Sequence, residues 1–249
     1  MALPDALKIE TAALSCWPDL ECEYDHAWLR RAANGYTKRA NSVQSLDPAD
    51  DGNAAERIAA SVRWFEERRL PPVFRITPLA GAGILAALDA AGWSTIDRSK
   101  LMAMELGSKS PDPRVEIYDP LDDRFLSAQQ ALQGYSDETR AKLRAVMLAL
   151  DVKAGGIVLY GEDARPVSSA MMSIAQGIVI TGNVVTDARE RRKGYGAAMM
   201  RTGLAWAWSA GARVAALNVA AENAAGQALY RGLGYEAQYD YTYRRPGRA

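Results

Sequence analysis

The chain has 249 residues, of which 49 % are hydrophobic and 24 % charged, a composition typical of a globular protein with one large domain or two smaller ones. Its 30 basic and 30 acidic residues cancel, which argues against nucleic acid or a membrane surface as a partner. The single histidine, His26, excludes a histidine-rich metal site, and we expect no bound metal.

Cysteine usage and hydropathy predict the compartment. Cys16 and Cys22 form no C-x-x-C pair, which is typical of idle thiols in a reducing cytosol. No apolar run approaches the ~20 residues that a membrane helix needs, and the N-terminus does not resemble a signal peptide. We therefore expect a cytoplasmic protein, as a monomer or homodimer.

His26 lies in a predicted strand with no serine motif nearby, which disfavours a catalytic triad.

The first half predicts short strands between helices. Asn34-Gly35 is a strong hairpin signal and predicts a tight turn between the first two strands. The helices are predicted over residues 3–15, 54–69 and 78–91, and the strands over 27–33, 36–43, 73–77 and 94–106. The stretch from Gly107 to Pro113 has the composition of a linker, so we place a domain boundary there, between residues 1–107 and 113–249.

The second half predicts strand meanders interrupted by helices, which indicates an α+β fold with a mixed sheet. The strands are predicted over residues 114–118, 157–160, 167–175, 178–186, 214–219 and 235–243, and the helices over 121–132, 137–150, 196–210 and 223–232.

The most informative stretch runs from Asn183 to Tyr235 and begins as a strand that breaks into a glycine-containing turn. Gly194 and Gly196 have no β-carbon, so an anion could approach the backbone N–H groups of the following helix. Three basic residues, Arg191, Arg192 and Lys193, surround that point. These features predict a diphosphate site; a basic turn that caps an ordinary helix is the alternative.

The two halves also resemble each other. A shift of 142 positions aligns residues 33–93 with residues 175–235 without a gap, and the predicted turns, helices and strands coincide. Identities are few, but Trp64 aligns with Trp206 and Gly92 with Gly234. We interpret the chain as a tandem repeat.

The first copy lacks the features of the predicted anion site. Ala49, Asp50 and Asp51 align with the three basic residues of the second copy, and two carboxylates there would repel a diphosphate. We therefore expect one active centre, in the second half of the chain.

A second glycine motif, Gly81-Ala82-Gly83-Ile84-Leu85-Ala86, fits the G-x-G-x-x-[G/A] pattern of dinucleotide-binding folds, with Glu105 further along the chain. Because no parallel strand–helix–strand unit is predicted around it, we interpret this motif as an ordinary helix start.

The pattern Arg191-x-x-Gly194-x-Gly196, followed by Asn223 and by Leu229-Tyr230-x-x-x-Gly234-Tyr235, resembles the GNAT superfamily of acetyl-CoA-dependent N-acetyltransferases. The resemblance covers residues 113–245. The first half resembles the degenerate copy of tandem members. The resemblance implies two GNAT-like folds, each with a mostly antiparallel twisted sheet flanked by helices. Only the second fold would have a cofactor site.

The resemblance implies a role for each matching residue. The strand at Val184, Val185 and Thr186 would diverge from its neighbour and pair with the pantetheine arm of acetyl-CoA. The pyrophosphate would be bound by the loop that contains Arg191, Arg192, Lys193, Gly194, Tyr195, Gly196 and Ala197. Asn223 would lie on the cofactor side of the next helix.

The implied reaction is direct attack of an amine on the thioester, in a ternary complex. A backbone N–H at Val184 or Val185 would stabilise the oxyanion, and Tyr230 would protonate the leaving thiolate. Tyr230 could instead pack its helix against the sheet. Asn218 stands where several members carry a glutamate base, and an amide cannot accept the proton, so the base is unassigned. Glu222 is a possible substitute.

The acceptor is expected to be a primary amine of a small molecule or a peptide. Asn218 and Tyr135 are the candidate acceptor-binding residues, with the tyrosines of residues 239–243 and the Arg- and Asn-rich segment 28–43 as further candidates for the walls. A non-catalytic acyl-CoA-binding module is the alternative function, and NAD binding at Gly81–Ala86 is a third hypothesis.

Overall fold

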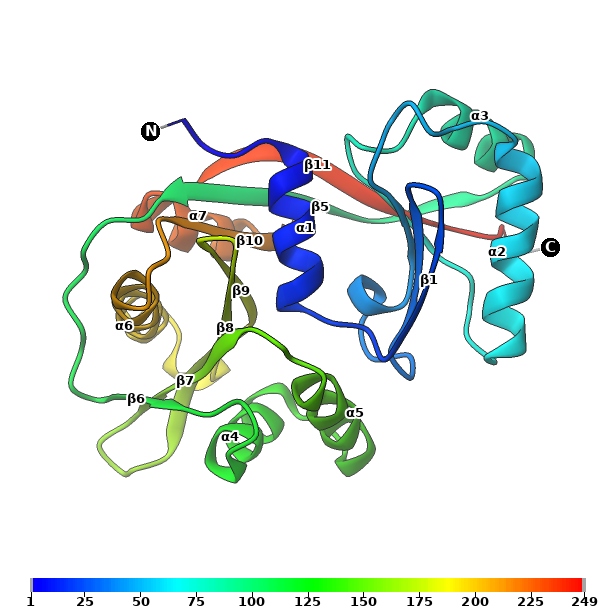
Figure 1. The fold of residues 1–249 in the computed structure, drawn as a ribbon. Coiled ribbons are helices and arrows are strands. Elements are labelled where there is room, and N and C mark those ends of the chain that lie inside the picture. Colours follow the sequence, from blue (N-terminus) through cyan, green and yellow to red (C-terminus); the bar gives the residue numbers. More distant parts are fainter. Residues whose placement is uncertain (1, 248–249) are drawn as a thin grey trace.

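All strands of the described chain, residues 2–247, join one mixed sheet in the computed structural model (Figure 1). The sheet order is β1-β2-β3-β4-β11-β5-β10-β9-β8-β7-β6. Only β3–β4 and β9–β10 pair in parallel, so the predicted mixed, mostly antiparallel fold is confirmed. The strands are β1 (Glu21–Asp25), β2 (Trp28–Ala32), β3 (Val43–Ser45), β4 (Phe74–Ile76), β5 (Ser94–Glu105), β6 (Val115–Tyr118), β7 (Lys153–Tyr160), β8 (Pro166–Ala175), β9 (Ile178–Thr186), β10 (Val214–Ala220) and β11 (Glu236–Arg245).

Helices cover both faces of the sheet. They are α1 (Ala6–Cys16), α2 (Ala54–Glu67), α3 (Ala82–Ala90), α4 (Asp123–Gln133), α5 (Asp137–Leu148), α6 (Tyr195–Ser209) and α7 (Ala224–Leu233), with 3-10 turns at η1 (Lys38–Ala40) and η2 (Ala188–Glu190). Within residues 2–247, no helix combines the length and apolar character that crossing a bilayer requires.

The two faces can be followed along β5, because successive side chains of a strand point to opposite sides. Met102 joins the core under α6 and α7, whereas Leu101 joins the core under α1. We call these two sides the α6 face and the α1 face. The helix α1 comes from the first half of the chain, yet it packs on strands β8 and β9 of the second half.

The two halves exchange their last strands. β5, from the first half, lies between β10 and β11 of the second half, with Asn218 opposite Leu101. In return β11 lies between β4 and β5 of the first half, with Tyr243 opposite Arg75. The linker at residues 107–113 connects β5 to β6, but it does not separate two sheets.

Element boundaries agree with the 142-residue repeat. Ala82 and Ser94, the first residues of α3 and β5, align with Ala224 and Glu236, the first residues of α7 and β11. Ala54, the first residue of α2, aligns with Gly196, the second residue of α6. Each half therefore ends in the same helix–strand–helix–strand order.

The predicted Asn34-Gly35 hairpin is wrong. β2 and β3 do pair antiparallel, but the connection between them spans residues 33–42 and contains η1. The side chain of Asn41 organises it, accepting from the backbone N–H of Ala33 and Gly35 and donating to the carbonyl of Tyr36. The tight two-residue hairpin lies earlier, between β1 and β2, so His26 is in a turn and not in a strand.

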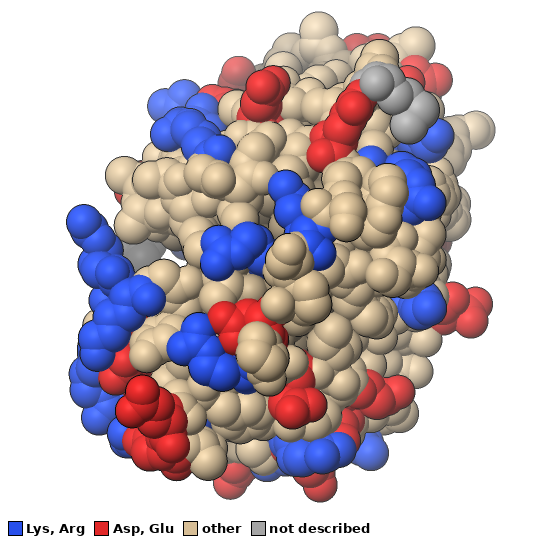
Figure 2. All heavy atoms as spheres, turned by 90° about the vertical axis from the view of Figure 1, so that its left-hand side faces the viewer, with Lys and Arg blue, Asp and Glu red and all other residues tan. Residues whose placement is uncertain are grey.

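Charged side chains on the side of the molecule where α6 and β6 lie are mixed in sign (Figure 2). Lys and Arg gather along one edge of this view, Asp and Glu interleave with them below, and much of the face is uncharged. Any anion site on this side would therefore be formed by a small group of cations and not by a broad basic surface.

The strand exchange predicts that neither half is stable alone. A fragment of residues 113–249 lacks β5, so β10 and β11 lose the strand that joins them, together with buried Leu101 and Met102. We expect this fragment to show no cooperative thermal transition by circular dichroism where the full chain shows one. Co-expression with residues 1–112 should restore it. A fragment that melts cooperatively on its own would contradict this prediction.

Candidate active site

The strands β9 and β10 pair in parallel only as far as Thr181 and Leu217 and then diverge. Beyond this point β9 continues to Thr186 along β8, and β10 continues to Ala220 along β5. One edge of each strand is therefore without a strand partner, which leaves backbone N–H and C=O groups available inside the sheet.

A β-bulge at Asn183 accompanies this divergence. Ser169 and Met171 of β8 pair with Val185 and Gly182 of β9, so β9 has one residue more than its partner over this span. Asn183 has a φ of 52°, in the left-handed region. Bulges bend a strand and disrupt its ladder, and this one turns β9 away from β10.

The predicted phosphate turn lies at the end of β9. Arg192 and Gly194 both have positive φ, 66° and 82°, and α6 begins directly afterwards at Tyr195. The first N–H groups of the helix have no partner within it and lie at the positive end of its dipole. A β-carbon at Gly196 would lie 3.1 Å from Thr186 Oγ1, so the helix starts close to the strand end.

The basic residues of this turn are exposed. Lys193 Nζ lies 3.0 Å from the Glu190 carboxylate, and Arg191 Nε donates to the carbonyl of Thr186 at 3.4 Å. The ion pair with Glu190 raises the pKa of Lys193. The turn thus presents cationic side chains, glycines and helix N–H groups together, as an anion site requires.

An open cleft of about 310 Å³ follows the divergence of the two strands. It is lined by Thr37, Lys38, Arg39, Ser99, Thr181, Gly182, Asn183, Val184, Asn218, Val219, Ala220, Asn223, Tyr230, Tyr241 and Tyr243. Six of these residues were site candidates from the sequence: Val184, Asn218, Asn223, Tyr230 and, less directly, Tyr241 and Tyr243 of β11. The cleft connects both faces of the sheet, because Tyr230 packs in the core of the α6 face and Asn218 points to the α1 face.

Tyr230 lies near the C-terminal end of α7, on its buried side. Asn223 begins α7 by accepting the Gly226 N–H at its side-chain oxygen (2.9 Å), and Gly234, with a φ of 105°, ends it. Gln227, Tyr230 and Leu233 form the buried stripe at helical spacing. The Tyr230 ring is 6.0 Å from that of Tyr235. Burial raises the pKa of Tyr230 to about 12, so the phenol keeps its proton at neutral pH.

Other candidates lie outside the cleft lining. Tyr135 is two hydrogen bonds away from the cleft residue Asn183. Asn183 Nδ2 donates to the Tyr36 hydroxyl at 3.2 Å, and that hydroxyl donates to the Tyr135 hydroxyl at 3.3 Å. Glu222 is exposed and does not line the cleft. Tyr239 donates to Glu10 at 2.6 Å, whereas Tyr241 and Tyr243 line the cleft.

The first half of the chain contributes Thr37, Lys38, Arg39 and Ser99 to the cleft. Individually these residues were not candidates. Their positions depend on the strand exchange and on the connection between β2 and β3, which local sequence patterns do not encode. The only signal was the Arg- and Asn-rich composition of residues 28–43.

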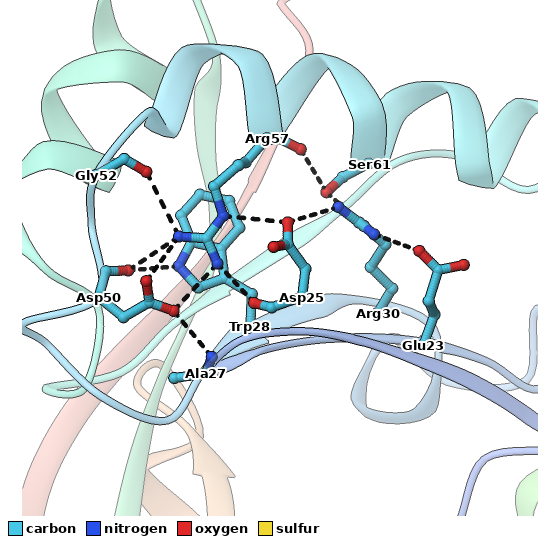
Figure 3. A network of polar contacts seen from close by, with 9 residues as sticks. All are labelled: Glu23, Asp25, Ala27, Trp28, Arg30, Asp50, Gly52, Arg57 and Ser61. Carbon is cyan, nitrogen blue, oxygen red and sulfur yellow. Dashed lines mark hydrogen bonds and ion pairs between the residues drawn. The ribbon is translucent and has the colours of Figure 1, made fainter.

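The equivalent turn of the first copy is occupied by its own carboxylates. Asp50 accepts from Arg57 Nη1 at 2.9 Å and from the Ala27 N–H at 2.8 Å, and Arg57 stacks 4.0 Å from the Trp28 ring centre (Figure 3). The hydrogen bond from Arg57 lowers the pKa of Asp50. These contacts fix the turn in place.

Asp51 explains the second glycine motif. Its carboxylate accepts the Gly83 N–H at 2.7 Å, in the first turn of α3. A β-carbon at Gly81 or Gly83 would lie within 2.9 Å of Asp51 atoms, so the glycines allow this close approach. The flanking strands β4 and β5 are separated by β11, so no parallel strand–helix–strand unit surrounds the motif.

Comparisons with known proteins show the family of the chain. A family model described as "Probable histone acetyltransferase Rv0428c C-terminal" matches residues 5–244. The chain is 25 % identical to the uncharacterized N-acetyltransferase YobR of Bacillus subtilis, over 97 % of this chain and 99 % of that protein. It is 30 % identical to the probable histone acetyltransferase Rv0428c of Mycobacterium tuberculosis over 122 residues, 47 % of this chain and 36 % of that protein.

Solved structures share the fold. A GCN5-related N-acetyltransferase from Kribbella flavida has a TM-score of 0.75 at 20 % identity and covers 99 % of this chain and 98 % of its own. A tandem GNAT protein from the clavulanic acid biosynthesis pathway has a TM-score of 0.63 at 13 % identity, over 84 % of this chain and 76 % of its own.

The fold, with its repeat and its diverging strands, is therefore that of the tandem GNAT N-acetyltransferases. The chain belongs to the family of the C-terminal part of the probable histone acetyltransferase Rv0428c, and it is a GNAT-type acyltransferase.

The raised pKa of Tyr230 predicts a loss of stability at high pH. In the unfolded chain the phenol titrates near a pKa of about 10, so between pH 10 and about 12 only the folded state keeps the proton. The contribution is thus present below pH 10 and is lost as the pH rises toward 12. We expect the free energy of unfolding to fall less steeply over this range in Tyr230→Phe than in Tyr24→Phe, at an exposed tyrosine. Equal slopes in denaturant titrations would contradict it.

Proposed function

We propose that the protein transfers the acetyl group of acetyl-CoA to a primary amine of a small molecule or peptide, by direct attack in a ternary complex. The observation that supports this most is the opening between β9 and β10, because Tyr230 and the free edge of β9 line the same cleft. The basic turn before α6 begins where β9 ends.

The residues present fit acetyl-CoA as the donor. The unpaired edge of β9 at Val184, Val185 and Thr186 offers backbone groups to the amides of a pantetheine arm. The turn from Arg191 to Gly196 offers helix N–H groups and cations to a pyrophosphate. Ala197, in the first turn of α6, adds a small side chain beside them.

Tyr230 acts as the general acid in this proposal. A tyrosine phenol is protonated at neutral pH, burial raises the pKa of Tyr230 further, to about 12, and the side chain lines the cleft from the α6 face. A coenzyme thiolate that leaves beside it receives this proton, and the phenol regains one from solvent through the open cleft.

The amine is bound on the α1 face. The side-chain oxygen of Asn218 is buried without a hydrogen-bond partner within residues 2–247, and it would accept an N–H of the incoming amine. A backbone N–H at Val184 or Val185 stabilises the oxyanion that develops on the acetyl carbonyl. Asn218 cannot take up a proton, so the amine enters as the free base, and the proton that its nitrogen must lose after the attack passes to water.

Removal of the acid tests the mechanism. Tyr230→Phe should lower kcat by roughly 10²–10⁴-fold, as expected for loss of a general acid, and leave the affinity for acetyl-CoA unchanged. Coenzyme A release gives the rate and calorimetric titration gives the affinity. Tyr235→Phe is the matched control, since Tyr235 is 1 % exposed and does not line the cleft. Unchanged turnover in Tyr230→Phe would remove the acid role.

The basic turn can be tested separately. Arg192→Glu places an anion beside the proposed pyrophosphate site and should weaken acetyl-CoA binding by about 1–2 kcal/mol, roughly ten-fold in Kd. The difference should shrink as salt is raised, because exposed charges are screened. Arg63→Glu, at an exposed arginine of α2, should leave the affinity unchanged. Equal effects of the two variants would argue against an anion site at this turn.

A further inference from the structure

The α1 face of the cleft has an unusual charge balance. None of the residues that line the cleft is an aspartate or a glutamate, whereas Lys38 and Arg39 are both cations. Lys38 Nζ is already paired with the Asp97 carboxylate at 2.8 Å. One positive charge, that of Arg39, is left without compensation at this wall.

Arg39 has a defined position but no polar partner. Its guanidinium lies 4.7 Å from the centre of the Trp17 ring, and a β-carbon at Gly182, on the diverging part of β9, would lie 3.5 Å from its Nη atoms. Within residues 2–247, its side chain makes no hydrogen bond or ion pair. The five donors of a guanidinium are normally satisfied when it is partly buried, so these donors are available to a ligand.

Other arginines near the cleft differ from Arg39 in this respect. Arg31 binds Asp19 at 2.7 Å, and Arg75 binds Glu10. Glu10 is the carboxylate of the adjoining cavity, and it also accepts from Gln44 and Tyr239. No carboxylate in this region is left over to neutralise Arg39.

The segment that carries Arg39 is held rigidly. Thr37 has a φ of 58°, a conformation that β-branched residues rarely adopt. Trp17 Nε1 donates to Thr37 Oγ1 at 2.9 Å, and Asn41 Nδ2 donates to the Thr37 carbonyl at 2.8 Å. Backbone strain kept in place by such contacts is characteristic of sites where a side chain is preorganised for a ligand.

We propose that Arg39 binds a carboxylate of the acceptor, so that the amine substrate is a small molecule of the amino-acid type, with an anionic group beside its amine. This inference rests on the proposed acetyl transfer and adds the class of acceptor. The first half of the chain then supplies the specificity of a site whose acid lies in the second half.

The chemistry of the amine is consistent with this assignment. A carboxylate next to an ammonium favours the charged form, which cannot attack a thioester. Pairing the carboxylate with Arg39 removes this effect at the site where Asn218 replaces a base. A lysine-rich peptide would instead bring further cations to a wall that has no carboxylate to receive them.

The test compares amines that differ only in the carboxylate, such as lysine with cadaverine, tyrosine with tyramine, and phenylalanine with phenethylamine, together with a lysine-rich peptide. We expect the wild-type protein to favour the α-amino acid of at least one pair. Arg39→Gln should raise KM for that amino acid by roughly 10- to 100-fold, the range for a hydrogen bond to a charged group, with kcat nearly unchanged. Activity with the decarboxylated amine should not fall.

Two controls make the result specific. Arg213→Gln removes another arginine that stacks on a tryptophan, 4.0 Å from the centre of the Trp208 ring, whose guanidinium donates to backbone carbonyls and lies outside the cleft. It reports the effect of losing such a stack on stability. Calorimetric titration with acetyl-CoA alone tests the donor site, and Arg39→Gln should bind the donor as the wild type does.

Three outcomes would overturn the inference. The first is acetylation confined to amines without a carboxylate or to the basic peptide. The second is an equal loss of activity with both members of a pair in Arg39→Gln. The third is binding of acetyl-CoA without acetylation of any amino acid. Failure to bind acetyl-CoA at all would instead contradict the proposed function itself, and the calorimetric titration separates the two cases.

Discussion

The pairing of β5 with both β10 and β11 is the constraint on which the rest of the structure depends. It joins two repeats into one sheet and lets β10 keep a partner on one edge while its other edge diverges from β9. It also places Ser99 of β5 and the tyrosines of β11 in the cleft. A GNAT unit with its own strands alone would have a different wall at this position.

The equivalent turns of the two copies carry charges of opposite sign. In the second copy, Arg192 and Gly194 leave the start of α6 open to an anion. In the first copy, Asp50 and Asp51 provide the anions from within the chain, and Arg57 and the Gly83 N–H receive them. The same turn therefore carries carboxylates bound within the chain in the first copy and exposed cations in the second.

Local patterns predicted much of the second half. Gly194, Asn223 and Gly234 are helix-boundary residues whose roles follow from backbone geometry, whereas Tyr230 became a candidate through the resemblance of its motif to that of the GNAT superfamily. The exchange of β5 and β11 could not be predicted, because it pairs residues such as Lys100 and Asp240 that are far apart in sequence. The prediction of a hairpin at Asn34-Gly35 was wrong for a related reason. The side chain of Asn41 accepts hydrogen bonds from the backbone of that turn and overrides the hairpin preference of the Asn-Gly pair.

The late position of β11 in the chain has a consequence for synthesis. Arg75 of β4 pairs with Tyr243, which is synthesised 168 residues later (243 − 75). A ribosome needs on the order of ten to thirty seconds to add that many residues. Throughout this time the nascent chain exposes the open edge of β4, and an exposed strand edge is a template for pairing with other chains. The shortness of β4, Phe74–Ile76, limits that hazard until the last strand emerges.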